Sequence, residues 1–81
     1  MIHLRTRPLS IGPLRTFECT ARLLNFRAAA DELALSQSAV SRQIQALEEE
    51  LGATLFLRQS RTVELTEAGA ILLRNTSVLL Q

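Results

Sequence analysis

The sequence has one cysteine, one histidine and no lysine among its 81 residues. Because Cys19 is alone, no intrachain disulfide can form, and nothing points to an oxidising compartment. Neither His3 nor Cys19 has neighbours at metal-ligand spacing or a partner for a nucleophilic triad. The three glycines are too scattered to build a phosphate-binding loop. These absences argue against an enzyme, a metal site and a bound cofactor, and they favour a small binding module.

Long hydrophobic runs are absent as well. No apolar stretch approaches the roughly 18 residues that a membrane helix requires, and the N-terminus lacks a signal-peptide pattern. We therefore expect no membrane partner. The length, with 47% hydrophobic and 21% charged residues, is typical of one small globular domain. A domain of this size buries only about 60% of its unfolded surface, so its core is marginal without a partner.

The net charge is only +1, from nine basic and eight acidic residues, which excludes a generic polycation that binds nucleic acid by bulk charge. All nine basic residues are arginines. The planar guanidinium suits bidentate contacts to phosphate or guanine, although a GC-rich genome explains the same bias more simply.

Residues 1–13 show no periodicity and are predicted to form a flexible arm, ending at a proline suited to the first position of a helix. Beyond it, apolar residues recur at helical spacing in two segments separated by Asn25, a favourable N-cap. The residues predicted to face inward are Leu14, Phe17, Ala21 and Leu24 in the first segment and Phe26, Ala29, Ala30 and Leu33 in the second.

A third helix is predicted over residues 37–51, capped by Ser36 and ended by Gly52. Its predicted core stripe is Val40, Ile44, Leu47 and Leu51, and the opposite face carries Ser38, Ser41, Arg42, Gln45 and Glu49. Two short helices joined by the tight link at residues 34–35, the second with a polar outer face, form the helix-turn-helix pattern.

Charge is ordered along this third helix. Serine, glutamine and arginine occupy the first half of the outer face, and the glutamates at residues 48–50 occupy the second half. A phosphate backbone would repel those glutamates, so a helix that meets DNA must enter by its N-terminal end. The spacing of the residues alone fits an ordinary surface helix as well as it fits a DNA-reading helix. The run of glutamates is typical of a solvated helix face.

After Gly52, an apolar run at residues 55–57 and alternation at residues 63–65 predict a small hairpin with Arg58 and Arg61 at its tip. Beside a recognition helix, such a hairpin is a clamp on the DNA backbone or minor groove, and a solvated turn is the plain alternative.

Thr66 is predicted to cap a last helix. One face, with Ala68, Ile71, Leu72, Val78 and Leu79, is expected to serve the core. Leu73 and Leu80 lie about 100° away on a second face, which we expect to pair with another helix. This helix has no C-terminal capping signal, so the natural protein is expected to continue beyond it.

One set of residues carries a family resemblance: Asn25-Phe26, Ala29-Ala30, Leu33, Ser36-Gln37-Ser38-Ala39-Val40-Ser41, Ile44, Leu47-Glu48, Leu51-Gly52, Leu55-Phe56, Arg58, Leu65-Thr66 and Ala68-Gly69. In this spacing they resemble the N-terminal domain of LysR-type transcriptional regulators, from about Leu14 to Leu73. The resemblance implies a mainly α, winged helix-turn-helix fold over residues 14–66, with three helices and a small β-hairpin wing. A linker helix used for dimerisation, over residues 67–81, would follow.

The resemblance also implies a partner and a setting. Such bacterial regulators bind interrupted palindromes in double-stranded DNA near promoters, as dimers or tetramers, in the cytoplasm at the nucleoid. RNA polymerase is a further partner to consider. A small effector is expected only for a C-terminal domain that these residues do not include.

Carried onto this chain, the family's DNA-reading residues fall on Ser36, Gln37, Ser38, Ser41, Arg42 and Gln45, with Arg58 and Arg61 in the wing. Arg42 suits a guanine edge or a phosphate, Gln37 suits a base edge, and the serines Ser38 and Ser41 suit phosphates. Two positions depart from the family pattern. Arg27 stands where a hydroxyl residue is usual, and we expect it to contact phosphate. Ser38 stands where proline is common, which would either loosen the helix tip or add a donor.

A rival interpretation from another class is a helical dimerisation or adaptor module whose outer face binds protein. Salt dependence separates the two, because DNA binding weakens steeply as salt rises.

Overall fold

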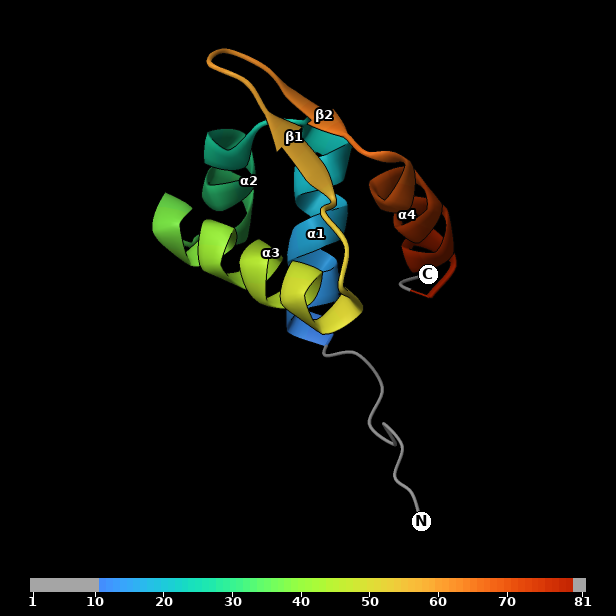
Figure 1. Ribbon diagram of the computed structural model, residues 1–81. Coiled ribbons are helices and arrows are strands. Elements are labelled where there is room, and N and C mark those ends of the chain that lie inside the picture. Colours follow the sequence, from blue (N-terminus) through green and yellow to red (C-terminus); the bar gives the residue numbers. More distant parts are fainter. Residues whose placement is uncertain (1–10, 80–81) are drawn as a thin grey trace.

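The computed structural model describes residues 11–79, with side chains as far as residue 76. In chain order the elements are α1 (Ile11–Leu23), α2 (Phe26–Leu33), α3 (Gln37–Leu51), β1 (Phe56–Arg58), β2 (Val63–Leu65) and α4 (Glu67–Leu79). The central helix α1 packs against α2 and α3 on one side and against α4 on the other (Figure 1). This arrangement, with its antiparallel hairpin, confirms the predicted winged helix-turn-helix fold.

Helix α1 begins at Ile11, earlier than the predicted start at Pro13. The first four N–H groups of a helix have no partner within the helix, so a proline within the first turn removes no hydrogen bond. Residues 11–13 therefore belong to the helix and not to the arm. The rest of the predicted arm, with His3, lies outside the described residues.

The helix caps follow the sequence prediction. The side chain of Asn25 accepts a 2.9 Å hydrogen bond from the N–H of Ala28, and that of Ser36 accepts a 3.1 Å bond from the N–H of Ala39. Gly52 ends α3 in the left-handed conformation, at φ 69°. Local side-chain chemistry thus sets where α2 and α3 begin and where α3 ends.

Two non-glycine residues, Leu24 and Ala34, also adopt the left-handed conformation, at φ 50° and 58°. Leu24 ends α1 and is 43% exposed, so its predicted place in the core is wrong. The reversal of the chain after Leu23 turns its side chain outward. Ala34 forms the link between α2 and α3, where the N–H of Leu35 donates a 2.9 Å hydrogen bond to the carbonyl of Ala30.

The core is formed where α1, α2, α3 and the hairpin meet. Its three aromatic rings are in contact, with centroids 5.5 Å apart for Phe17 and Phe56 and 5.4 Å apart for Phe26 and Phe56. Leu51 was predicted to face inward but is 40% exposed. The chain turns at Gly52 and brings Leu55 into the core instead, at 1% exposure.

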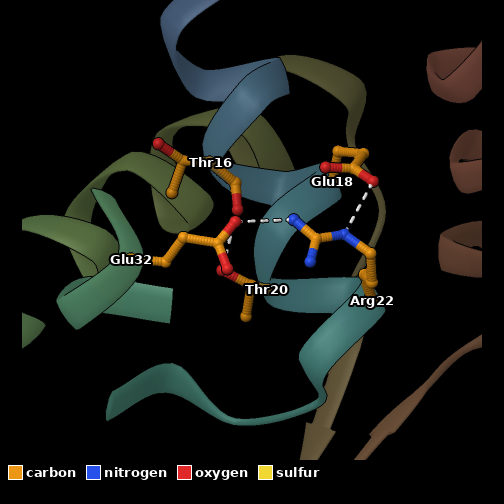
Figure 2. A network of polar contacts seen from close by, with 5 residues as sticks. All are labelled: Thr16, Glu18, Thr20, Arg22 and Glu32. Carbon is orange, nitrogen blue, oxygen red and sulfur yellow. Dashed lines mark hydrogen bonds and ion pairs between the residues drawn. The ribbon is translucent and has the colours of Figure 1, made fainter. Parts of the chain in front are cut away.

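Polar contacts also join the helices. Thr16 on α1 donates a 2.7 Å hydrogen bond to the side chain of Gln43 on α3. Arg22 on α1 pairs with Glu18 at 3.2 Å and with Glu32 on α2 at 2.8 Å (Figure 2). The side chains of Arg22, Glu18 and Glu32 are 47%, 24% and 48% exposed, so water screens these ion pairs and each adds little to stability.

The predicted hairpin is present, with Phe56 opposite Leu65 and Arg58 opposite Val63. Its turn is closed by a 2.8 Å hydrogen bond from the N–H of Gln59 to the carbonyl of Thr62. Because each strand has only three residues, its position depends on side chains that reach the helices.

The face that helix α4 presents to the core differs in part from the one predicted. Ala68 and Leu72 pack against the core as predicted, and the side chains of Val78 and Leu79 lie outside the described residues. Leu73 packs against the core beside Leu72, whereas Ile71 is 46% exposed, so the predicted faces of Leu73 and Ile71 are wrong. Helix α4 approaches the start of the hairpin closely at Gly69, where a Cβ would collide with the carbonyl oxygen of Leu55. Thr76, about two turns further along the same side of the helix, is 0% exposed.

Leu80, the second predicted pairing residue, lies outside the described residues. Within residues 11–79, none of the helices is long and apolar enough to cross a membrane.

Candidate nucleic-acid interface

The outer face of α3 is held away from the protein by its buried stripe of Val40, Ile44 and Leu47. In Figure 1 the N-terminal turn of α3 lies at the edge of the molecule opposite α4. The predicted reading residues on this face are therefore accessible: Ser36, Gln37, Ser38, Arg42 and Gln45 are exposed, and Ser41 is half-buried.

The N-terminal ends of α2 and α3 both favour an anion. Neither helix has an acidic residue in its first turn, so the positive end of each helix dipole is not neutralised. The exposed Glu49 lies near the far end of α3. The structure thus keeps the order of charge that the sequence predicted, with the acids away from the helix tip.

Ser38 does not loosen the tip of α3. The Ser36 cap is formed, the helix begins at Gln37, and the hydroxyl oxygens of Ser36 and Ser38 lie 3.3 Å apart. We expected Ser38, at a position where the family commonly has proline, either to loosen the helix tip or to add a hydroxyl donor. The structure agrees with the second of these.

A groove brings the wing close to the start of α2 and the start of α3. Residues from all three parts line it, namely Leu24, Asn25, Phe26, Arg27, Gln37, Arg58, Gln59, Ser60, Arg61, Thr62 and Val63. Arg27 therefore shares one depression with Arg58 and Arg61 of the wing, although 31 positions separate Arg27 from Arg58 in the sequence. A concave, positively charged surface of this kind suits a phosphate backbone.

The three arginines of this groove and Arg42 on the outer face of α3 differ in their partners. The guanidinium of Arg58 lies 3.8 Å above the ring centre of Phe26 and donates a 3.2 Å hydrogen bond to the Ser41 hydroxyl. By contrast, Arg27, Arg42 and Arg61 are exposed and make no hydrogen bond or ion pair within the part of the chain that the structure describes. These three are available to an incoming ligand.

Glu48 has a role that the sequence did not reveal. Its carboxylate accepts a 2.8 Å hydrogen bond from the backbone N–H of Leu55, and its carbonyl accepts one from Gly52. It is half-buried and joins the end of α3 to the start of the hairpin. From the sequence, Glu48 is grouped with the solvent-exposed glutamates of α3. Its partner, the N–H of Leu55, comes within reach only because the chain turns at Gly52.

Cys19 lies away from this surface, on α1, and is 1% exposed. Burial raises the pKa of its thiol, and the neighbouring Glu32 carboxylate adds to the effect. The Arg22 guanidinium, in turn, lowers the pKa of the Glu32 carboxyl. Within residues 11–79, no group of three or more His, Cys, Asp or Glu side chains could hold a metal ion.

The sequence and the fold of this chain are both similar to those of known proteins. Residues 11–70 match the model of bacterial regulatory helix-turn-helix proteins of the lysR family. An uncharacterised HTH-type transcriptional regulator, y4mQ from Sinorhizobium fredii, is 54% identical over 68 residues. That alignment covers 84% of this chain but only 23% of the relative, so the chain spans less than a quarter of that protein's length.

Two solved DNA complexes share the fold. The DNA-binding domain of BenM, in complex with its catB site 1 DNA, is 40% identical with a TM-score of 0.85, over 89% of this chain and 80% of that one. The DNA-binding domain of CbnR, also bound to DNA, is 39% identical with a TM-score of 0.85, over 89% and 83% of the two chains. The chain therefore belongs to the lysR family of bacterial regulatory helix-turn-helix proteins, and it forms a LysR-type DNA-binding domain.

Proposed function

We propose that this domain recognises specific double-stranded DNA sequences as part of a longer bacterial regulator of transcription. The observation that carries the proposal is the exposed N-terminal half of α3, which presents Gln37, Arg42 and Gln45 beside the arginine-lined groove. This half would enter the major groove, while the wing would contact the backbone or the minor groove. The DNA complexes of the similar BenM and CbnR domains support DNA binding by this domain.

The proposed roles follow from side-chain chemistry. Arg42 offers a bidentate guanidinium for a guanine edge, and Gln37 and Gln45 offer amides for base edges. Ser36, Ser38 and Ser41 offer hydroxyls for phosphate oxygens. Arg27 and Arg61, on the two sides of the groove, would bind phosphates of the flanking backbone, and Arg58 adds charge to the same surface.

We further propose that two copies pair through α4, so that two recognition helices read the two halves of an interrupted palindrome. The exposed Ile71 and Leu51 flank an apolar groove between α4 and the end of α3, and this groove supports the proposal. Leu73 contributes to packing against the core, so Ile71 is the better residue with which to test pairing. Ile71→Glu should lower the dimer fraction in sedimentation without unfolding the domain, and an unchanged dimer would contradict the proposal.

The intact regulator would work in the cytoplasm at the nucleoid, as a dimer or tetramer that influences RNA polymerase at nearby promoters. A further domain would bind its effector.

Selection of genomic fragments on the purified domain tests DNA recognition directly. Specific recognition predicts enrichment of a two-part motif, and the affinity for an enriched fragment should fall steeply as salt rises. Absence of any enriched sequence, with binding that does not depend on salt, would instead favour the protein-binding adaptor.

A further inference from the structure

Arg58 lies at the point where the wing meets two helices. It is the last residue of β1, yet its guanidinium stacks on Phe26 at the start of α2 and donates a hydrogen bond to Ser41 in the first half of α3. These partners are 32 and 17 positions away in the sequence. One side chain therefore contacts the wing's own strand, the helix that precedes the recognition helix, and the recognition helix itself.

The stacking partner is firmly held. Phe26 is 6% exposed, and its ring meets that of Phe56 nearly edge-on, at an interplanar angle of 69°. The ring of Phe56 in turn contacts the fully buried Phe17 on α1. The guanidinium thus rests on the outer end of an aromatic row that begins in the core, and its attraction to the ring face adds to this contact.

Apart from Val63, which lies opposite Arg58 and packs against the core, the outer part of the wing has few contacts with the helices. Each strand has three residues, Leu57 is 47% exposed, and residues 59–62 of the turn are all exposed. A two-stranded hairpin is marginal without packing against another element. Arg61, at the tip, makes no intramolecular hydrogen bond or ion pair in the described part of the chain, so it cannot anchor the turn.

We propose that Arg58 is a positioning residue, which sets the angle of the wing to the recognition helix and thereby lets Arg61 and α3 engage DNA together. The inference rests on the proposed DNA recognition for its functional consequence. This role of Arg58 differs from a simple phosphate contact, because one face of its guanidinium and one of its N–H groups already contact Phe26 and Ser41.

The first test needs no DNA. Amide hydrogen exchange in the wing, including the N–H of Gln59 that bonds Thr62, is compared in Arg58→Ala and in the matched tip variant Arg61→Ala. We expect wing exchange to become roughly fivefold to seventyfold faster in Arg58→Ala, the range expected for loss of a cation–π contact together with a hydrogen bond. Arg61→Ala should leave it unchanged. Equal effects of the two variants would overturn the proposal.

The second test measures affinity for an enriched DNA fragment, with circular dichroism confirming that each variant is folded. Arg58→Ala should weaken binding about tenfold, and Arg58→Lys, which retains the charge without the planar fork, should recover less than half of that loss in free energy. Complete recovery by lysine would show that only charge matters and would overturn the proposal.

A third variant separates stacking from DNA contact. Phe26→Leu removes the ring beneath the guanidinium while leaving every charge in place. In combination with Arg58→Ala it should add little to the loss in affinity, because both changes remove the same contact. Additive losses would overturn the proposal. If the wild-type domain bound no DNA specifically, the proposed function would fail, and the exchange experiment would still decide whether Arg58 anchors the wing.

Discussion

The carboxylate of Glu48 on α3 accepts a 2.8 Å hydrogen bond from the backbone N–H of Leu55, seven residues further along the chain. Leu55 is 1% exposed, so this bond satisfies a backbone group at the edge of the core. Two hydrogen bonds therefore join the recognition helix to the wing segment that follows Gly52. Glu48 bonds Leu55 near the start of the hairpin, and Ser41 bonds Arg58 nearer its tip.

Replacing Glu48 with alanine should lower the free energy of unfolding by about 1–2 kcal/mol, because the N–H of Leu55 loses its charged acceptor. Urea denaturation measures the change. The neighbouring exposed Glu49 provides the matched control, and Glu49→Ala should change stability by less than about 0.5 kcal/mol. Equal effects of the two variants would show that the hydrogen bond does not stabilise the domain.

Gly69→Ala should destabilise the domain, because its Cβ would collide with the backbone carbonyl of Leu55 and with the Leu65 side chain. A backbone group cannot move aside cheaply, so we expect a loss of roughly 2–3 kcal/mol, observed as a lower Tm. Gly12 is the control, since nothing lies within 4 Å of a Cβ built there. A Gly69→Ala variant as stable as Gly12→Ala would contradict the close approach of α4 to the hairpin.

Ala34→Gly should stabilise the domain by up to about 1 kcal/mol, because φ at this position is 58° and glycine adopts that conformation without steric cost. Thermal unfolding should therefore show a higher Tm. The same Ala→Gly substitution at Ala46, which is exposed within α3, should have the opposite effect and lower the free energy of unfolding by about 1 kcal/mol. A lower Tm for Ala34→Gly would argue against the left-handed link.

Arg42→Ala should weaken binding to a selected DNA site by about 1–3 kcal/mol and relax sequence preference, if Arg42 contacts a base edge. Binding titrations on cognate and random DNA distinguish the contacts, because an equal loss on both assigns Arg42 to a phosphate. Arg74→Ala removes the same charge from α4, on the far side of α1 (Figure 1), and should have little effect on affinity. A similar loss in both variants would contradict the interface on α3.

Stability should fall as pH rises above 9. Burial raises the pKa of Cys19 in the folded chain above its ordinary value of 9.0, so the unfolded thiol loses its proton first. The stabilisation is complete below pH 9 and is lost as the pH rises towards the pKa of the folded thiol. The sequence has no lysine and no tyrosine, so Cys19 is the one side chain that titrates in this interval.

Urea midpoints between pH 8 and 11 measure this effect, and Cys19→Ala should be less stable at pH 8 but nearly independent of pH above it. If the wild type and the variant lost stability in parallel, Cys19 would not be the group responsible.

Local features made much of this fold predictable. Asn25 and Ser36 cap the starts of α2 and α3 with their own side chains, and Gly52, which has no side chain, ends α3 in the left-handed conformation. All three were predicted in these roles. The errors lie at the ends of the apolar stripes. Leu24 and Leu51 continue the period in the sequence, but the chain reverses just after Leu23 and Leu51 and leaves both side chains exposed.

The orientation of α4 was not predictable from its hydrophobic pattern. The buried side of this helix includes Gly69 and Thr76, neither of which counts as hydrophobic in a periodicity argument. The pattern therefore favoured Ile71 over Leu73, whereas the structure turns Leu73 toward the core and leaves Ile71 exposed, with Ala68 and Leu72 inward as predicted.

The sequence by itself determined the helices, their caps, the recognition helix with its exposed Arg42, and the family, because each depends on residues close together along the chain or on a long matched pattern. Only the tertiary structure decided the partners of Arg58, the acceptor role of Glu48 and the inward face of α4. Those contacts join residues that become neighbours only after the chain has turned at Gly52 and again at the hairpin, and no local pattern encodes which side chain will then lie opposite which.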